Sequence, residues 1–311
     1  MIIDRLVTKI RDLSAPIVVG LDPRPEQIPS HIKDETFARE GRTPRAVAEA
    51  FLLFNKGIID QIYDIVPAVK PQIAMYEQLG PIGIDAYFRT IRYAKEKGLI
   101  VIGDIKRGDI ASTAEAYSTA HIGKLNIEGT DAANPEYSSA DFITINPYMG
   151  FDSISPYIDD CKNHDKGLFI LVKTSNPGSR DVQDVVTEGG KPVYAHVGAL
   201  VSEWGKDFVG EWGYSMIGAV VGATHPEESA ELRKAMPHTF FLVPGYGAQG
   251  GSGKDLEGIW DGDKYGAIVN SSRGITGAYQ TKKFGAPDKD FALSARAAVI
   301  DMKTDLGGFI K

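Results

Sequence analysis

The chain has 311 residues, of which 43% are hydrophobic and 24% are charged, an ordinary composition for a globular protein with a large core. Its formal net charge of −7 argues against a sequence-independent grip on nucleic acid, although a local basic pocket for a small anion stays compatible with it. Because Cys161 is the only cysteine, no intrachain disulfide can form, and we expect a reducing, cytoplasmic location. The first residues lack the pattern of a signal peptide and no apolar run reaches membrane-spanning length, so we expect no membrane partner.

Eight short apolar runs, rich in valine and isoleucine, recur along the chain and predict strands. They show little polar alternation, which is typical of strands buried on both faces of a parallel sheet. The segments between them carry helical periodicity, and strand followed by helix, eight times over, predicts a (β/α)8 TIM barrel. An open doubly wound sheet is the rival, but no Gly-x-Gly-x-x-Gly follows the first run, which disfavours its dinucleotide-binding form. The expected strands are residues 17–21, 68–72, 99–105, 142–146, 168–173, 216–222, 240–244 and 267–270.

Helix starts and long connections complete the expected architecture. Thr43 and Pro44 fit the cap and first position of one helix, and Ser112 with Glu115 fits a capping box opening another. We expect one domain, residues 1–311, with long loops at about 23–45 and 176–204. In a barrel both loops open on the catalytic face, so each is either a lid or decorated surface.

The segment Ile102-Gly-Asp-Ile-Lys-Arg-Gly-Asp-Ile110 carries the strongest chemical signal. A strand alternates its faces, so Asp104 and Lys106 point the same way at the end of the third expected strand. With Lys70 on the second strand and Asp109 in the following loop, they could form an alternating charge array. Buried charges are costly unless paired or used, and strand ends are where barrel enzymes do their chemistry. A structural ion-pair network is the alternative.

Two glycine-rich segments after the last two strands suggest an anion site. One is Pro244-Gly-Tyr-Gly-Ala-Gln-Gly-Gly251 and the other is Asn270-Ser-Ser-Arg-Gly274. Loops after strands seven and eight commonly hold phosphate in this architecture, because glycines let backbone N–H groups approach its oxygens. Arg273 could add a charge-assisted contact and Gln249 a neutral donor. Ordinary turns with a surface arginine are the alternative.

These segments together resemble the orotidine 5′-phosphate decarboxylase family. The Gly-Asp-Ile-Lys-Arg-Gly-Asp-Ile segment looks like its signature, and four further segments match in the right order. The chain length and the two long loops resemble the longer, type 2 subgroup of that family. The matching segments are Ala68-Val-Lys-Pro-Gln, Thr174-Ser-Asn-Pro-Gly, Pro244-Gly-Tyr-Gly-Ala-Gln-Gly-Gly and Ser272-Arg-Gly.

The resemblance implies an activity and a role for each matching residue. The activity is decarboxylation of orotidine 5′-monophosphate to uridine 5′-monophosphate, the last step of de novo UMP synthesis, without cofactor or metal. Lys106 would protonate C6 of the pyrimidine, Asp104 would lie beside the departing carboxylate, and Lys70 would hold the ribose and the charge array. Asp109 would reach, with Ile110 and Thr113, into the partner's site of a homodimer. The remaining implied contacts are Asp22 to a ribose hydroxyl, Ser175 to the pyrimidine, and Gln249 with Arg273 to the phosphate.

Two other functions stay open at this stage. A Mg²⁺-dependent sugar-phosphate decarboxylase or lyase of the same superfamily shares the Asp-x-Lys-x-x-Asp pattern, but here the second strand offers Lys70 where an acidic ligand would be expected. A non-catalytic sensor of nucleotide phosphates would keep the phosphate loops and could lose Lys106. The histidines show no metal-binding spacing, so we expect no metal. They are His31, His121, His164, His196, His225 and His238.

Overall fold

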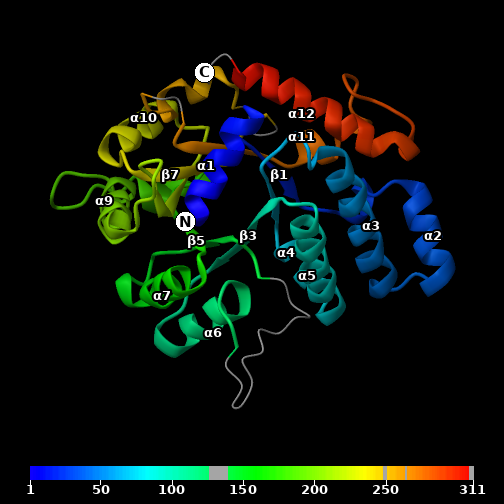
Figure 1. Cartoon of the computed structure of the whole chain (residues 1–311), viewed down its shortest axis with the longest axis horizontal. Helices are drawn as coiled ribbons and strands as arrows, with labels where there is room; N and C mark the ends of the chain where they lie inside the picture. The colour runs from blue at the N-terminus through cyan, green and yellow to red at the C-terminus, as the bar shows by residue number, and fades with distance from the viewer. Residues whose placement is uncertain (126–138, 248–250, 263–264, 308–311) are drawn as a thin grey trace.

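The computed structural model describes residues 1–125, 139–247, 251–262 and 265–307. Its eight parallel strands pair in chain order, and β8 returns to pair with β1, so the sheet closes into a barrel (Figure 1). The predicted (β/α)8 TIM barrel is therefore confirmed. The strands are β1 (Ile17–Leu21), β2 (Ala68–Pro71), β3 (Ile100–Arg107), β4 (Phe142–Ile145), β5 (Gly167–Lys173), β6 (Ser215–Val221), β7 (Thr239–Val243) and β8 (Ala267–Ser271).

Helices surround the barrel and bury its outer face. In Figure 1, α2 to α5 lie on one side, α6 and α7 below, α9 and α10 on the opposite side, and α12 along the top. No helix of the described residues is long and apolar enough to cross a membrane. The helices are α1 (Ile2–Leu13), α2 (Ser30–Glu40), α3 (Pro44–Ile62), α4 (Ala74–Glu77), α5 (Pro81–Glu96), α6 (Ala111–His121), α7 (Ser155–His164), α8 (Arg180–Gln183), α9 (Val193–Gly205), α10 (Pro226–Ala235), α11 (Arg273–Thr276) and α12 (Phe291–Gly307).

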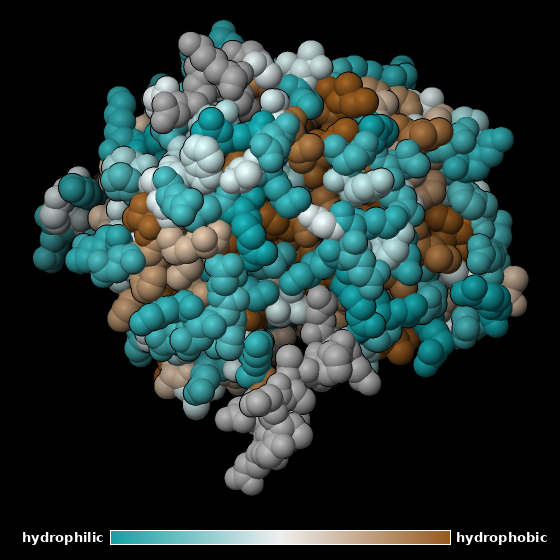
Figure 2. All heavy atoms as spheres, viewed as in Figure 1, coloured by the Kyte–Doolittle hydropathy of each residue, from teal (hydrophilic) through white to brown (hydrophobic). Residues whose placement is uncertain are grey.

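The first helix, α1, covers the amino-terminal end of the barrel. Its apolar face is buried in the core, while the backbone N–H of Ile2 and the Arg5 guanidinium both bind the carboxylate of Asp165, just before β5. Figure 2, drawn from the same side, shows hydrophilic residues over most of this face. The amino-terminal end is thus closed, which leaves the carboxyl-terminal end for a site.

Helix α3 shows how the apolar pattern translates into packing. Phe51, Phe54, Ile58 and Ile62 are all buried, as their spacing predicts. Thr43 caps the helix as expected, since its side-chain oxygen accepts the N–H of Ala46 at 3.2 Å.

Several boundaries differ from those expected. The third strand runs on to Arg107, past the expected end at residue 105. The predicted capping box was wrong, because α6 begins at Ala111 after Ile110, and no side chain caps it. The two long connections also carry structure of their own, with α2 inside 23–45, and α8 and most of α9 inside 176–204.

Candidate active site

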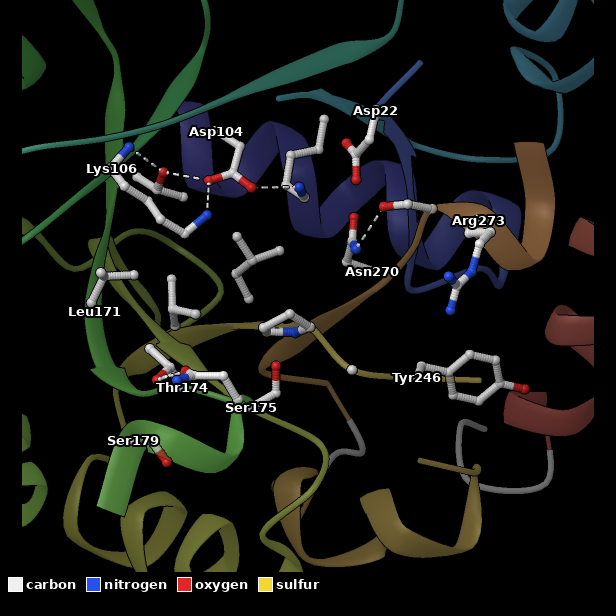
Figure 3. Close-up of a pocket in the computed structure, with 18 of the residues that line it drawn as sticks. Asp22, Asp104, Lys106, Leu171, Thr174, Ser175, Ser179, Tyr246, Asn270 and Arg273 are labelled. Atoms are coloured by element: carbon white, nitrogen blue, oxygen red, sulfur yellow. Dashed lines mark hydrogen bonds and ion pairs between the residues drawn. The ribbon is translucent and has the colours of Figure 1, made fainter. Parts of the chain in front are cut away.

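A cavity of about 700 Å³ opens at the carboxyl-terminal end of the barrel. Most of the strands contribute a residue to its wall, so segments far apart in sequence meet there (Figure 3). Six residues predicted from the sequence line this one cavity. They are Asp22, Lys70, Asp104, Lys106, Ser175 and Arg273.

Asp104 lies at the centre of a lysine–aspartate–lysine array. Its Oδ2 atom accepts a hydrogen bond from Lys70 Nζ at 2.6 Å, and its Oδ1 atom accepts one from Lys106 Nζ at 2.5 Å. The Lys70 side chain is only 5% exposed, whereas that of Lys106 is 46% exposed and faces the cavity. One lysine therefore belongs to the barrel wall, and the other is open to a ligand.

The array keeps Asp104 and Lys70 charged. Burial alone would raise the pKa of Asp104, but the two ammonium groups outweigh it and hold that pKa well below its usual range. Burial alone would lower the pKa of Lys70, yet the carboxylates of Asp104 and Asp22 hold it above its ordinary value. The buried ion pair of Asp104 and Lys70 can therefore persist here at neutral pH.

Three buried oxygen atoms in the cavity wall have no hydrogen-bond partner within the described part of the chain. They are Oγ of Ser179, Oδ1 of Asp22 and Oδ1 of Asn270. A buried polar atom without a partner is costly, so such atoms mark places where a bound molecule can supply the missing partner. The two Oδ1 atoms are acceptors and suit the hydroxyl groups of a sugar.

The segment after β5 forms the opposite wall of the cavity and is held from two sides. Gln183 accepts the backbone N–H of Thr174 at 2.9 Å and donates to its hydroxyl at 2.9 Å. On the other side, a Cβ atom at Gly222 would lie 2.9 Å from Ser175, so only glycine lets the β6 end approach this closely. Ser175 is thereby fixed facing the cavity.

Arg273 opens helix α11 directly after β8 and lies across the cavity from Lys106 in Figure 3. Arg24, from the connection after β1, adds another cation to the wall. The predicted partner of Arg273, Gln249, lies outside the described residues. The cavity thus has cations at both ends, an arrangement that suits a ligand with two separated anionic groups.

Asp109, Ile110 and Thr113 do not line the cavity of their own chain. The Asp109 carboxylate accepts the N–H of Ile110 at 2.8 Å, while Ile110 and Thr113 are exposed at the start of α6. The four-member charge array considered from the sequence therefore has three members within one chain.

Sequence reasoning missed several wall residues, among them Thr144, Gln183 and Arg24. Thr144 could have been found, because it is a polar residue inside the apolar run of β4 and such a residue needs a partner. Gln183 and Arg24 lie in the two long connections, where polar residues are ordinary and carry no signal.

Within the described residues, no group of three or more His, Cys, Asp or Glu side chains is placed to hold a metal ion. The carboxylates in the cavity wall are Asp22 and Asp104, and both oxygens of Asp104 are bound to lysines. The donor set therefore offers an incoming divalent cation little free carboxylate.

A closed barrel with a buried charge array at one side of its mouth and an arginine at the other defines a barrel enzyme for a small anionic substrate. Comparison with known proteins gives the family. A family model described as orotidine 5′-phosphate decarboxylase / HUMPS family matches residues 16–284, and the chain belongs to that family. The resemblance read from the sequence motifs is thus confirmed.

Relatives match over nearly the whole chain. An orotidine 5′-phosphate decarboxylase of Rhodopirellula baltica is 44% identical over 93% of both chains, and one of Petrotoga mobilis is 42% identical over 98% of both. Among solved structures, OMP decarboxylase of Leishmania donovani has a TM-score of 0.69 at 29% identity, covering 97% of this chain and 98% of that one. UMP synthase of the same organism has a TM-score of 0.70 at 31% identity, with 97% of this chain matching 56% of that one.

Proposed function

We propose that this chain decarboxylates orotidine 5′-monophosphate to uridine 5′-monophosphate and carbon dioxide, as the last step of UMP synthesis. The observation that carries the proposal is the array of Lys70, Asp104 and Lys106 facing one cavity with Arg273 on its far side. The substrate has a carboxylate at one end and a phosphate at the other, which fits cations at both ends of the cavity. The relatives' names support the same activity.

Lys106 supplies the proton. When the bond between C6 and the carboxylate breaks, its electron pair stays on C6, and carbon dioxide leaves without it. An ammonium already placed beside C6 stabilises that charge as it forms and then delivers a proton to it. Because Asp104 holds the Lys106 ammonium at 2.5 Å, the cation is oriented before the substrate enters.

Asp104 and Lys70 prepare the site for this step. The Asp104 carboxylate stays ionised and would lie beside the substrate carboxylate, so repulsion between the two favours loss of carbon dioxide. We rank the stabilisation by Lys106 above this repulsion. Lys70 balances the buried charge of Asp104 and, with Asp22, offers contacts to the ribose.

Phosphate binding is remote from the bond that breaks. Arg273 and Gln249 would hold the phosphate, and Ser175 would contact the pyrimidine edge from the opposite wall. Binding energy from the phosphate can then align C6 with Lys106, which contributes to turnover as well as affinity. In this scheme the reaction uses the chain's own side chains, without cofactor or metal.

The test is direct. Purified protein is mixed with orotidine 5′-monophosphate in the presence of EDTA, and the ultraviolet absorbance change is followed while the product is identified by chromatography. We expect uridine 5′-monophosphate at a rate that EDTA leaves unchanged. Loss of activity with EDTA that returns with Mg²⁺ would favour the metal-dependent lyase, and binding without turnover would favour a sensor.

We also propose a cytoplasmic homodimer in which Asp109 and Thr113 reach the partner's site. The support is an exposed apolar cluster around Asp109, and exposed apolar groups of this kind mark protein interfaces. Helix α6 packs against the turn at Phe151, so the two segments that carry the cluster lie side by side. Its members are Ile110, Tyr148, Met149 and Phe151, exposed by 51%, 86%, 49% and 50%.

Mixing two inactive variants tests this dimer. Lys106→Met and Asp109→Asn are each expected to be inactive alone, whereas a mixed dimer keeps one site with both native residues. Random reassortment should restore about a quarter of the parent activity. Recovery of none, with mixed dimers present by mass spectrometry, would contradict a shared site.

A further inference from the structure

The backbone beside the catalytic array is irregular. Strands β3 and β4 are in register at Gly103 with Ile143 and again at Arg107 with Ile145. Between these pairs β3 has the three residues 104–106 where β4 has only Thr144, so β3 forms a bulge. Bulges next to active sites re-aim side chains, and this one contains two members of the array.

The bulge places Lys106 in a strained conformation. Its φ is 44°, in the left-handed region that residues with a Cβ atom rarely adopt. Such a conformation persists only where neighbouring groups hold it. The direction in which the Lys106 ammonium points therefore depends on whatever fixes this part of β3.

The hydroxyl of Thr144 makes two contacts at this point. It accepts the backbone N–H of Lys106 at 3.0 Å, and it donates to Oδ1 of Asp104 at 2.8 Å. A hydroxyl can accept and donate at once, so one atom links the backbone of Lys106 to the carboxylate that binds its ammonium. Thr144 is only 1% exposed, so water cannot readily replace it.

We propose that Thr144 is a positioning residue for the decarboxylation, holding the bulge that aims Lys106 and the carboxylate that orients its ammonium. This inference rests on the proposed role of Lys106. In a regular strand pairing, a main-chain carbonyl would accept the Lys106 N–H, whereas here the Thr144 hydroxyl accepts it. The same hydroxyl donates to Asp104 Oδ1, the atom that binds the Lys106 ammonium. Small displacements of a catalytic group cost far more in rate than in binding.

The experiment compares Thr144→Val, which keeps the shape and removes the hydroxyl, with Thr144→Ser, which keeps the hydroxyl. Thr90→Val is the matched control. Thr90 is also 1% exposed, and its hydroxyl likewise both donates, to the Ala86 carbonyl at 2.8 Å, and accepts, from Asn55 at 3.3 Å, but it lies in α5 away from the cavity.

We expect Thr144→Val to lower kcat by about 10- to 100-fold while KM changes by less than about threefold. Thr144→Ser should restore most of kcat. Thr90→Val should lower the melting temperature without changing kcat. Full kcat in Thr144→Val would overturn the proposal, and so would Thr144→Ser being as slow as Thr144→Val, because the hydroxyl would then not be responsible.

A folding failure is separated by measuring the melting temperature and the affinity for uridine 5′-monophosphate in each variant. A Thr144→Val protein that binds this nucleotide as the parent does, yet turns over slowly, supports positioning. A Thr144→Val protein that also loses nucleotide binding would overturn the positioning role and indicate a structural role for Thr144. If Lys106→Met keeps full turnover, the proposed function fails instead, whatever Thr144 does.

Discussion

The barrel contains two lysine–aspartate–lysine clusters, one at each end. At the carboxyl-terminal end, Asp104 binds Lys70 and Lys106 at 2.6 and 2.5 Å. At the amino-terminal end, just before β4, Asp141 lies 3.2 Å from the ammonium of Lys95 and 3.7 Å from that of Lys166. The same residue types thus meet at both ends of the barrel, although Lys95 belongs to α5, and Asp141 and Lys166 come just before β4 and β5.

The two clusters differ in the partners that their remaining hydrogen-bond donors and acceptors bind. Lys95 and Lys166 also donate to the carbonyls of Ser139 and Ala140, at 3.0 and 2.8 Å, and Asp141 accepts the N–H of Val101. These groups are satisfied by the fold itself. In contrast, the Lys106 ammonium lines the cavity. A charge cluster therefore becomes a catalytic candidate when one of its members is left open to a ligand.

The largest expected effect is a loss of activity when the carboxyl-terminal cluster is changed. Lys106→Met removes the more exposed ammonium of the array, and with it the stabilisation of the charge on C6. We expect kcat to fall by about 1,000-fold or more, with a much smaller change in nucleotide affinity. Steady-state kinetics measure kcat, and binding of uridine 5′-monophosphate measures the nucleotide affinity. A kcat equal to that of the parent would rule out Lys106 as the proton donor.

Arg273→Ala should act at the other end of the cavity and mainly on binding. A hydrogen bond to a charged group contributes roughly 1.5–3 kcal/mol, so we expect KM to rise by about 10- to 100-fold. A control is orotidine without its phosphate, which should be bound equally by the parent and the variant. If Arg273→Ala weakens both compounds equally, Arg273 does not contact the phosphate.

Lys166→Met tests the amino-terminal cluster as the counterpart of Lys106→Met. Asp141 keeps Lys95 and the N–H of Val101, so the loss should be limited to about 1–3 kcal/mol of stability. We expect kcat within about twofold of the parent, because the cluster lies at the closed end of the barrel. Denaturant unfolding and kinetics measure the two effects, and a large loss of kcat would mean that the ends are coupled.

His121 gives a smaller effect that depends on pH. Burial, helped by Arg107, lowers the pKa of His121 from 6.5 to about 4. Between pH 4 and pH 6.5 the His121 imidazole is protonated in the unfolded chain and neutral in the folded chain. The free energy of unfolding therefore falls as pH falls from 6.5 toward 4, by about 3 kcal/mol at most. In the His121→Gln variant, this part of the pH dependence of the unfolding free energy should be absent. Unfolding free energies that fall equally steeply with acid in both proteins would contradict it.

The strands and most site residues could be predicted because each depends on local pattern. Apolar β-branched runs fixed the strands to within two residues, and polar residues at their ends marked Asp22, Lys70, Asp104 and Ser175. The bulge in β3 could not be predicted, since it shows only in how β3 pairs with the neighbouring strand β4. Alternation nevertheless placed Asp104 and Lys106 on one face correctly.

Other features depend on contacts that a single sequence does not show. Ser112 and Glu115 fit a capping box by spacing, which would make Thr113 the first helical residue, but α6 begins two residues earlier, at Ala111 with φ of 47°. The wall residue Gln183 takes its role from Thr174, which lies in the segment after β5. The place of Asp109 depends on a second chain, so it stays a prediction.

The most direct test of the central claim is a crystal structure of the chain with uridine 5′-monophosphate bound. We expect the Lys106 ammonium within about 3.2 Å of C6, Asp104 beside the position of the lost carboxylate, and Arg273 on the phosphate. A nucleotide bound with C6 turned away from Lys106, or with its phosphate at the Asp104 end, would contradict the account.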